Sequence, residues 1–180
     1  MLGYRKKANP NFRNVLICID KFKDTLSAPD AAATIQGVLK SRYADDVKIQ
    51  SVLVSDGGDG FLDCIEVVKS SGEDKVERVA MSVDGPMPDQ ITEGSFLLNK
   101  ASKTAYIEAA NLNGLQSVPM DKRDPFVNTS MGIGQCMRTC FDDYGVRKFI
   151  IGSGGSAFSD GGFGAVRAMN VFDFKTKNGD

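Results

Sequence analysis

Residues 149–164 read FIIGSGGSAFSDGGFG, and this stretch is the most informative part of the chain. A short apolar run over residues 149–151 predicts a buried strand that leads into a glycine-rich loop. Glycines let backbone N–H groups converge on an anion, so Gly154, Gly155 and Ser156 are candidate phosphate ligands. The dipole of a helix behind the loop would favour the same anion. A tight strand-to-helix turn without a ligand explains the pattern equally well, because such turns are common in α/β folds.

Two units of strand, loop and helix precede this stretch. Residues 15–19 are an apolar run typical of a strand buried on both faces of a parallel sheet, and residues 48–54 predict a second strand. The first helix is predicted over residues 27–41, because Ser27 with Asp30 forms a start similar to a capping box. The residues predicted to face inward from the two helices are Ala31, Ile35, Val38, Leu39, Leu62, Ile65 and Val68.

Both units carry polar residues where their strands end. Asp20, Lys23 and Ser27 follow the first strand, and Asp56 with Gly57 and Gly58 follows the second. Ligands of open α/β sheets bind at the carboxyl ends of the strands, so these loops are candidate binding loops. Asp56 is equally well explained as a turn-former or helix cap, and Lys23 as a solvated surface lysine.

The pattern changes after residue 76. Residues 79–83, 91–98 and 104–107 predict strands of a separate small sheet, and residues 113–130 are irregular. An amphipathic helix that Gly145 would end is indicated by Ile133, Cys136, Met137, Cys140 and Phe141. Residues 164–169 predict another helix, and residues 171–174 a strand.

Composition predicts an ordinary globular protein. The chain has 180 residues, 42% hydrophobic and 25% charged, enough for one domain or for one and a part. A net charge of −1 gives no basic face, so we expect no nucleic-acid partner. No stretch is apolar enough to cross a bilayer, so we expect no membrane association and a cytoplasmic protein. Residues 1–13 are basic, which is more typical of a disordered tail than of a transit peptide.

The absence of histidine excludes whole classes of chemistry. A Ser-His-Asp or Cys-His hydrolase and a His-ligated zinc site are ruled out, so proton transfer falls to carboxylates or lysines. The apolar neighbours of the four cysteines indicate reduced, buried thiols. Cys136 and Cys140 lie one helical turn apart, which favours two core residues over a functional dithiol.

The chain stops one residue after Asn178-Gly179. Asn-Gly after a strand is a strong signal of a hairpin, and the returning strand does not follow. We therefore expect this chain to be truncated relative to a larger folding unit.

The loops, taken in order, resemble the glycerate kinase family of type 1. The matches are Asp20-Lys21-Phe22-Lys23 with Leu26-Ser27-Ala28 to DxFKGSLSA, Asp56-Gly57-Gly58-Asp59-Gly60 to DGGDG, Gly85-Pro86 to TGP, Ile107-Glu108-Ala109-Ala110 to IEMA, Arg123-Asp124-Pro125 to RDP, and Gly154-Gly155-Ser156-Ala157 through Asp160-Gly161-Gly162 to GGSATNDGG. Asp24, Phe158 and Ser159 depart from the family pattern. Because family members are about twice as long by this resemblance, a missing C-terminal half is expected to complete the fold.

The resemblance implies an α/β fold with a flavodoxin-like parallel-sheet domain, partial here, and a second, smaller α/β swivelling domain. We assign residues 1–13 to the tail, 14–76 to the first domain and 77–180 to the second, truncated at its C-terminal end.

The implied activity is transfer of the γ-phosphate of ATP to D-glycerate, with ATP and Mg²⁺ as cofactors. Phosphoryl transfer needs charge neutralisation and positioning. The predicted catalytic residues are Lys23, Asp56 and Asp160, the two aspartates are also the predicted metal ligands, and the predicted substrate or phosphate ligands are Asp20, Ser27, Gly57, Gly58, Gly154, Gly155 and Ser156. The alternatives are a catalytically inactive fragment and a small-molecule anion-binding module of the same fold.

Overall fold

The computed structural model describes residues 11–23, 25–43, 46–70, 72 and 74–172. By its contacts the chain divides into two compact units, residues 1–56 and 57–180, and each is described by itself. Several sequence predictions lie outside the described residues: the tail over residues 1–10, the departure at Asp24, residues 173–174 of the last predicted strand, and the Asn178-Gly179 turn.

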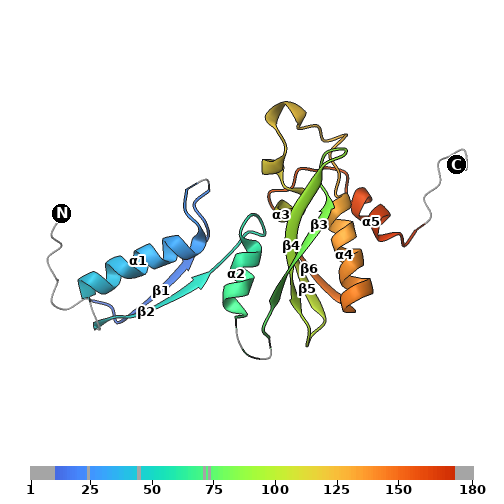
Figure 1. The fold of residues 1–180 in the computed structure, drawn as a ribbon. Coiled ribbons are helices and arrows are strands. Elements are labelled where there is room, and N and C mark those ends of the chain that lie inside the picture. The colour runs from blue at the N-terminus through green and yellow to red at the C-terminus, as the bar shows by residue number, and fades with distance from the viewer. Residues whose placement is uncertain (1–10, 24, 44–45, 71, 73, 173–180) are drawn as a thin grey trace, which may run out of the picture. The chain divides into compact units, whose positions relative to one another are not determined.

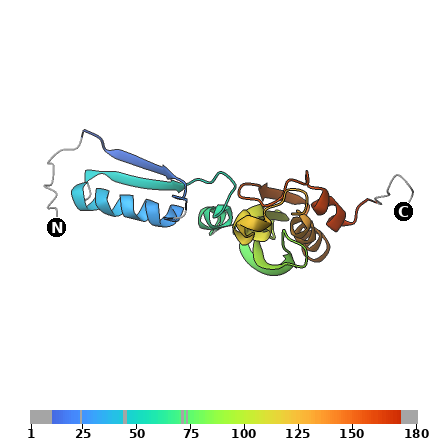
Figure 2. The same cartoon turned by 90° about the horizontal axis from the view of Figure 1, so that it is seen from above.

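The first unit is a strand, helix and strand. Strands β1 (Asn14–Ile19) and β2 (Lys48–Leu53) pair in parallel, from Asn14 opposite Lys48 to Ile19 opposite Leu53. Helix α1 (Ala28–Tyr43) connects them and lies along one face of the pair (Figures 1 and 2). The predicted elements are therefore confirmed, including the parallel arrangement.

The prediction that the first strand is buried on both faces is wrong. In β1 only Ile17 is buried, and Leu16 is 61% exposed. The reason is that, among the described residues of this unit, α1 covers a single face of a two-stranded sheet. The helix makes its contact through Ala28, Ala31 and Ala32, so the predicted inward residues Ile35 and Val38 are exposed.

The second unit is built on a four-stranded sheet in the order β3 (Glu77–Asp84), β4 (Ile91–Asn99), β5 (Thr104–Glu108) and β6 (Lys148–Gly152). The first three strands are antiparallel, whereas β6 runs parallel to β5. The predicted small sheet is confirmed, and the strand before the glycine-rich loop forms its edge. Because β6 is an edge strand, Ile151 is 40% exposed, and the prediction that this strand is buried is wrong for that residue.

Helices cover both faces of this sheet. Helices α3 (Ala109–Asn113), α4 (Met131–Tyr144) and α5 (Phe163–Met169) lie on one side, and α2 (Phe61–Val68) lies on the other (Figure 1). Short 3-10 turns span Leu115–Ser117 and Met120–Lys122. Successive residues of β4 show the alternation, since Phe96 and Leu98 pack toward α4 while Leu97 packs with Leu62 of α2.

Helix α2 belongs to this unit by its contacts. Leu62 of the helix packs with Leu97 and Tyr106 of the sheet, so the compact unit begins at Gly57. The domain boundary between residues 76 and 77 stays a prediction. Val68, at the end of α2, is 64% exposed and does not face inward as predicted.

The prediction of an amphipathic helix α4 is confirmed, although Phe141 is 49% exposed. The helix ends at Gly145, which adopts a left-handed φ of 64° and donates its N–H to the carbonyl of Cys140. Cys136 and Cys140 are fully buried in the core, and their mutual contact together with burial raises the pKa of the Cys136 thiol. All four cysteines are free, as expected, but Cys18 is exposed because it lies on the uncovered face of β1.

After α5, Val171 and Phe172 are exposed and are not in a strand, so the predicted strand over 171–174 is wrong for its described part. Within the described ranges, no helix is both long and apolar enough to cross a membrane.

Candidate functional site

In the first unit, the loops after the two parallel strands meet. The Asp20 carboxylate accepts a hydrogen bond from the Lys21 N–H at 2.7 Å and one from the Asp56 N–H at 3.3 Å. Asp20 therefore ties the end of β1 to the end of β2, at the sheet edge where ligands of such folds bind. The predicted residues Asp20 and Asp56 are brought together.

The lysine beside Asp56 is Lys21. Its Nζ lies 3.9 Å from Asp56 Oδ1, and the Asp56 side chain is 72% exposed. Lys23 is exposed on the same loop. Sequence reasoning missed Lys21, although its place directly after Asp20 was a signal that it belongs to the strand end.

Ser27 caps α1. Its hydroxyl accepts the Asp30 N–H at 3.2 Å and donates to the Asp30 carboxylate at 2.6 Å. The predicted capping start is confirmed. The role of Ser27 in binding substrate stays a prediction.

In the second unit, two glycine loops touch through their backbones. The Gly154 N–H donates to the Gly57 carbonyl at 3.0 Å. A Cβ on Gly152 would lie 2.6 Å from that carbonyl oxygen, and a Cβ on Gly154 would lie 2.8 Å from Gly58 Cα. The absence of side chains is therefore required here by the close approach of the two loops. The Gly154 amide, a predicted phosphate ligand, is already bonded to the protein.

Asp59 lies at this meeting point. A Cβ placed on Gly155 would be 3.7 Å from both of its carboxylate oxygens, and Gln116 Nε2 donates to its Oδ2 at 3.3 Å. The Gly155 carbonyl accepts the Leu115 N–H, and Ser156 bridges to Gly114. The predicted residues Gly57, Gly58, Gly154, Gly155 and Ser156 are thus gathered, with Asp59 beside them.

Asp160 holds the start of two helices. Its carboxylate accepts the Gly162 and Gly164 N–H groups at 2.9 and 3.0 Å, and the Ser130 N–H and hydroxyl at 2.9 and 2.8 Å. Burial alone would raise the pKa of Asp160, but the bonds from Ser130, Gly164 and Gly162 outweigh it, so the pKa lies below its ordinary value. Asp160 is therefore a charged anchor of α4 and α5.

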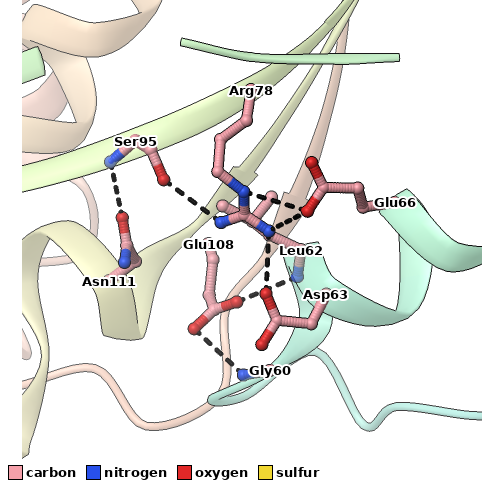
Figure 3. Close-up of polar contacts among 8 residues, drawn as sticks. All are labelled: Gly60, Leu62, Asp63, Glu66, Arg78, Ser95, Glu108 and Asn111. Carbon is pink, nitrogen blue, oxygen red and sulfur yellow. Dashed lines mark hydrogen bonds and ion pairs between the residues drawn. The ribbon is translucent and has the colours of Figure 1, made fainter. Parts of the chain in front are cut away.

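Glu108 holds the start of α2. It is the last residue of β5, is 6% exposed, and accepts the Gly60 N–H at 3.2 Å and the Leu62 N–H at 3.0 Å (Figure 3). Burial raises the pKa of its carboxyl, opposed by these two bonds and reinforced by the nearby Asp59 and Asp63. Glu108 lies in the family motif Ile107-Glu108-Ala109-Ala110 but was not among the predicted site residues. An acid at the end of a wholly buried strand was the signal.

These loops are also what the chain shares with known proteins. The glycerate kinase family matches residues 15–180, a range that contains the described loops of both units. The chain belongs to the glycerate kinase family.

Relatives of known name support this family assignment. The chain is 37% identical over 157 residues to a glycerate 2-kinase from Escherichia coli, covering 87% of this chain and 39% of the relative. It is 36% identical over 157 residues to a glycerate kinase from Bacillus subtilis, covering 86% of this chain and 38% of the relative. The chain thus spans about two fifths of the length of these curated glycerate kinases.

Solved structures agree. A crystal structure assigned as glycerate kinase 2 from Salmonella typhimurium LT2 matches with a TM-score of 0.73 and 30% identity. The match covers 94% of this chain and 44% of that one. The predicted membership of this kinase family and the partial α/β fold are therefore confirmed.

Of the residues predicted to bind Mg²⁺ and ATP in this chain, some suit that role better than others. Mg²⁺ favours carboxylate oxygens and retains waters, which suits the exposed Asp56 carboxylate better than Asp160, whose two oxygens both accept protein hydrogen bonds. Among the described residues, no acidic or cysteine side chains gather in groups of three or more that could hold a metal. The backbone contact of the two glycine loops is compatible with a phosphate beside them.

Proposed function

We propose that this chain is part of a kinase that transfers the γ-phosphate of ATP to D-glycerate, with Mg²⁺, in the cytoplasm. The observation that carries the proposal is the contact between the loops at Gly57–Gly58 and Gly152–Gly155, with the Asp59 carboxylate beside Gly155. The proposed substrate is a small organic acid. We propose that neither nucleic acid nor a membrane is a partner.

The chemistry explains why such loops suit this reaction. The transition state of phosphoryl transfer is stabilised mostly by positioning the reactants and by neutralising charge. The protein has little covalent chemistry to perform. Glycine loops let the backbone approach a phosphate closely, and lysines supply positive charge. Bound Mg²⁺ would supply further neutralisation of the phosphate oxygens.

The residues of the first unit are assigned the following proposed roles. Lys21 and Lys23 compensate negative charge on glycerate or phosphate, and Asp56 holds the metal. Asp20 keeps the two strand-end loops together through its bond to the Asp56 N–H. Ser27 contributes by capping α1 and so shaping the loop that carries the lysines.

In the second unit, we assign phosphate binding to the backbone of Gly57, Gly58, Gly155 and Ser156. Gly154 supports these residues, since its N–H bonds the Gly57 carbonyl. Asp160 supports them by holding the start of α5 behind the loop. As the base that accepts the glycerate hydroxyl proton we propose Asp59, because it is the carboxylate beside the loops.

The test is release of ADP from Mg-ATP, coupled to an optical assay, with and without D-glycerate. It is run on the 180-residue chain and on the same chain extended by any coding sequence that follows it. Glycerate-dependent turnover in either form supports the proposal. Nucleotide binding without turnover in both forms would favour the anion-binding module, and neither binding nor turnover would contradict the kinase.

Lys21→Ala and Lys23→Ala, measured side by side in an active form, separate the two lysines. If Lys23 is the clamp, kcat/KM falls for Lys23→Ala. If Lys21 is the clamp, the loss appears in Lys21→Ala, where the contact with Asp56 is also removed. Unchanged kcat/KM in both variants would contradict charge compensation by this loop.

A further inference from the structure

The loop from Gly57 to Gly60 is held to the rest of the second unit by several separate bonds. Its first residue accepts the Gly154 N–H, and Asp59 accepts the side chain of Gln116. Its last residue donates to Glu108. Of these partners Glu108 is the charged one, and it is the one that also bonds the first turn of α2, through Leu62.

Glu108 reaches this loop from the sheet (Figure 3). It stands at the end of β5, so its backbone is fixed by pairing with Gly152 of β6. Its two carboxylate oxygens take one amide each, Oε1 from Gly60 and Oε2 from Leu62. The end of the loop is therefore bonded to β5, a strand whose five residues are all buried.

The rest of α2 is held in a different way. Arg78 of β3 bonds Asp63 and Glu66 of the helix at 2.7 Å each, and Ser95 of β4 at 3.3 Å (Figure 3). The Asp63 side chain is exposed and the Glu66 side chain is partly exposed in these pairs, and ion pairs so accessible to solvent contribute little. The Arg78 pairs therefore hold the body of the helix, whereas the bonds of Glu108 hold the end of the loop and the first turn.

We propose that Glu108 is the positioning residue of the candidate site, whose carboxylate sets the Gly57–Gly60 loop and thereby places Asp59 beside Gly155. The effect of Glu108 on turnover rests on the proposed function, whereas its effect on the position of the loop is independent of that function.

Burial makes this carboxylate costly, which argues against a purely space-filling role. Only 6% of Glu108 is exposed, and Asp59 and Asp63 add negative charge nearby. An apolar residue would pack at this position without that penalty, but it would leave two amides near the loop without an acceptor. The bonds to the loop are what the carboxylate supplies.

The conservative variant Glu108→Gln tests the proposal. Glutamine keeps the size of the side chain, but its single oxygen replaces two, and its NH₂ group opposes an amide donor. Glu66→Gln is the matched control, because Glu66 is a glutamate of α2 that accepts hydrogen bonds from Arg78.

The first readout is the backbone amide signals of Asp59, Gly60 and Leu62 in two-dimensional NMR spectra of the chain. We expect Glu108→Gln to move all three and Glu66→Gln to leave them in place. Signals that stay in place in Glu108→Gln, or that move equally in both variants, would overturn the positioning role whatever the turnover.

The second readout is kcat and KM in the active form. We expect kcat to fall roughly tenfold in Glu108→Gln with KM nearly unchanged, because a misplacement of about 1 Å is enough to slow a positioned reaction by up to about 10²-fold. An unchanged kcat with moved amide signals would overturn the catalytic consequence. A wild-type protein without turnover would contradict the proposed function instead, and the amide signals would then decide the role of Glu108 in the loop.

Discussion

Glu108 and Asp160 perform the same structural task in two regions of one unit. Each accepts backbone N–H groups at the beginning of a helix, Glu108 at α2 and Asp160 at α5. Their pKa values nevertheless move in opposite directions, upward for Glu108 and downward for Asp160.

The difference shows how burial competes with hydrogen bonding. Glu108 is 6% exposed and has two amide donors, so the penalty for burying its charge prevails. Asp160 is only partly buried, and it collects bonds from Ser130, Gly162 and Gly164, so the bonds prevail. The charged form of the carboxyl group is therefore favoured at Asp160 and disfavoured at Glu108.

The largest effect is expected from Asp160→Ala. It removes a charged acceptor shared by the starts of α4 and α5, and we expect a loss of about 3 kcal/mol in the free energy of unfolding. Urea denaturation followed by circular dichroism measures it. A loss no larger than that of Glu108→Ala would break the comparison.

Glu108→Ala is expected to destabilise less, by about 2 kcal/mol, because two amides lose their acceptor while the penalty of a buried charge is also removed. The same denaturation experiment applies. Glu66→Ala serves as the control, with a change of at most about 1 kcal/mol expected for an exposed pair.

Gly60→Ala tests how much of the local stability near Glu108 comes from the loop backbone. Gly60 has a φ of +85°, and a Cβ there would meet nothing within 4 Å, so the substitution adds only left-handed backbone strain of about 1 kcal/mol. Gly37→Ala in α1 is the control without positive φ, and there we expect a gain of up to about 1 kcal/mol. A loss at Gly60 as large as that of Glu108→Ala would mean that the loop backbone, rather than Glu108, sets the local stability.

The smallest effect is the opposite pH dependence of the two anchors. The lowered pKa of Asp160 contributes stability above the ordinary aspartate pKa of about 3.9, and this is lost as pH falls through the folded value. The raised pKa of Glu108 makes its contribution greatest below about pH 4.3 and weaker as pH rises through the folded value.

Unfolding free energies measured across this acidic range, for wild type against Asp160→Asn and Glu108→Gln, isolate the two contributions. We expect the stability difference from wild type to grow with pH for Asp160→Asn and to shrink or change sign for Glu108→Gln. The same trend in both variants would contradict the assignment of opposite pKa directions.

Much of the fold was predictable because its signals are local. Apolar periodicity indicated β1, β4 and α4, and Ser27 with Asp30 indicated the start of α1. Exposure was less predictable: Leu16, Ile35 and Val68 are apolar and exposed, because periodicity does not say which faces of an element are covered.

The candidate site was predictable only in part. The glycine loops were identified from their composition, and the structure shows that their backbones touch. Lys21 and Glu108 were missed because each is defined by a partner distant in the sequence. Lys21 follows β1, but its partner Asp56 follows β2. The Gly60 amide that bonds Glu108 lies 48 positions before it in the sequence.

Propensity, periodicity and motif spacing are properties of neighbouring residues, so the order of strands and helices, the family and the loops that carry glycine and acid could be predicted from the sequence. Which carboxylate faces which helix start is a matter of the tertiary structure. That choice depends on how the strands pair and how α2 and α5 pack, and it sets burial and hydrogen bonding, which together determine the pKa of Glu108 and of Asp160.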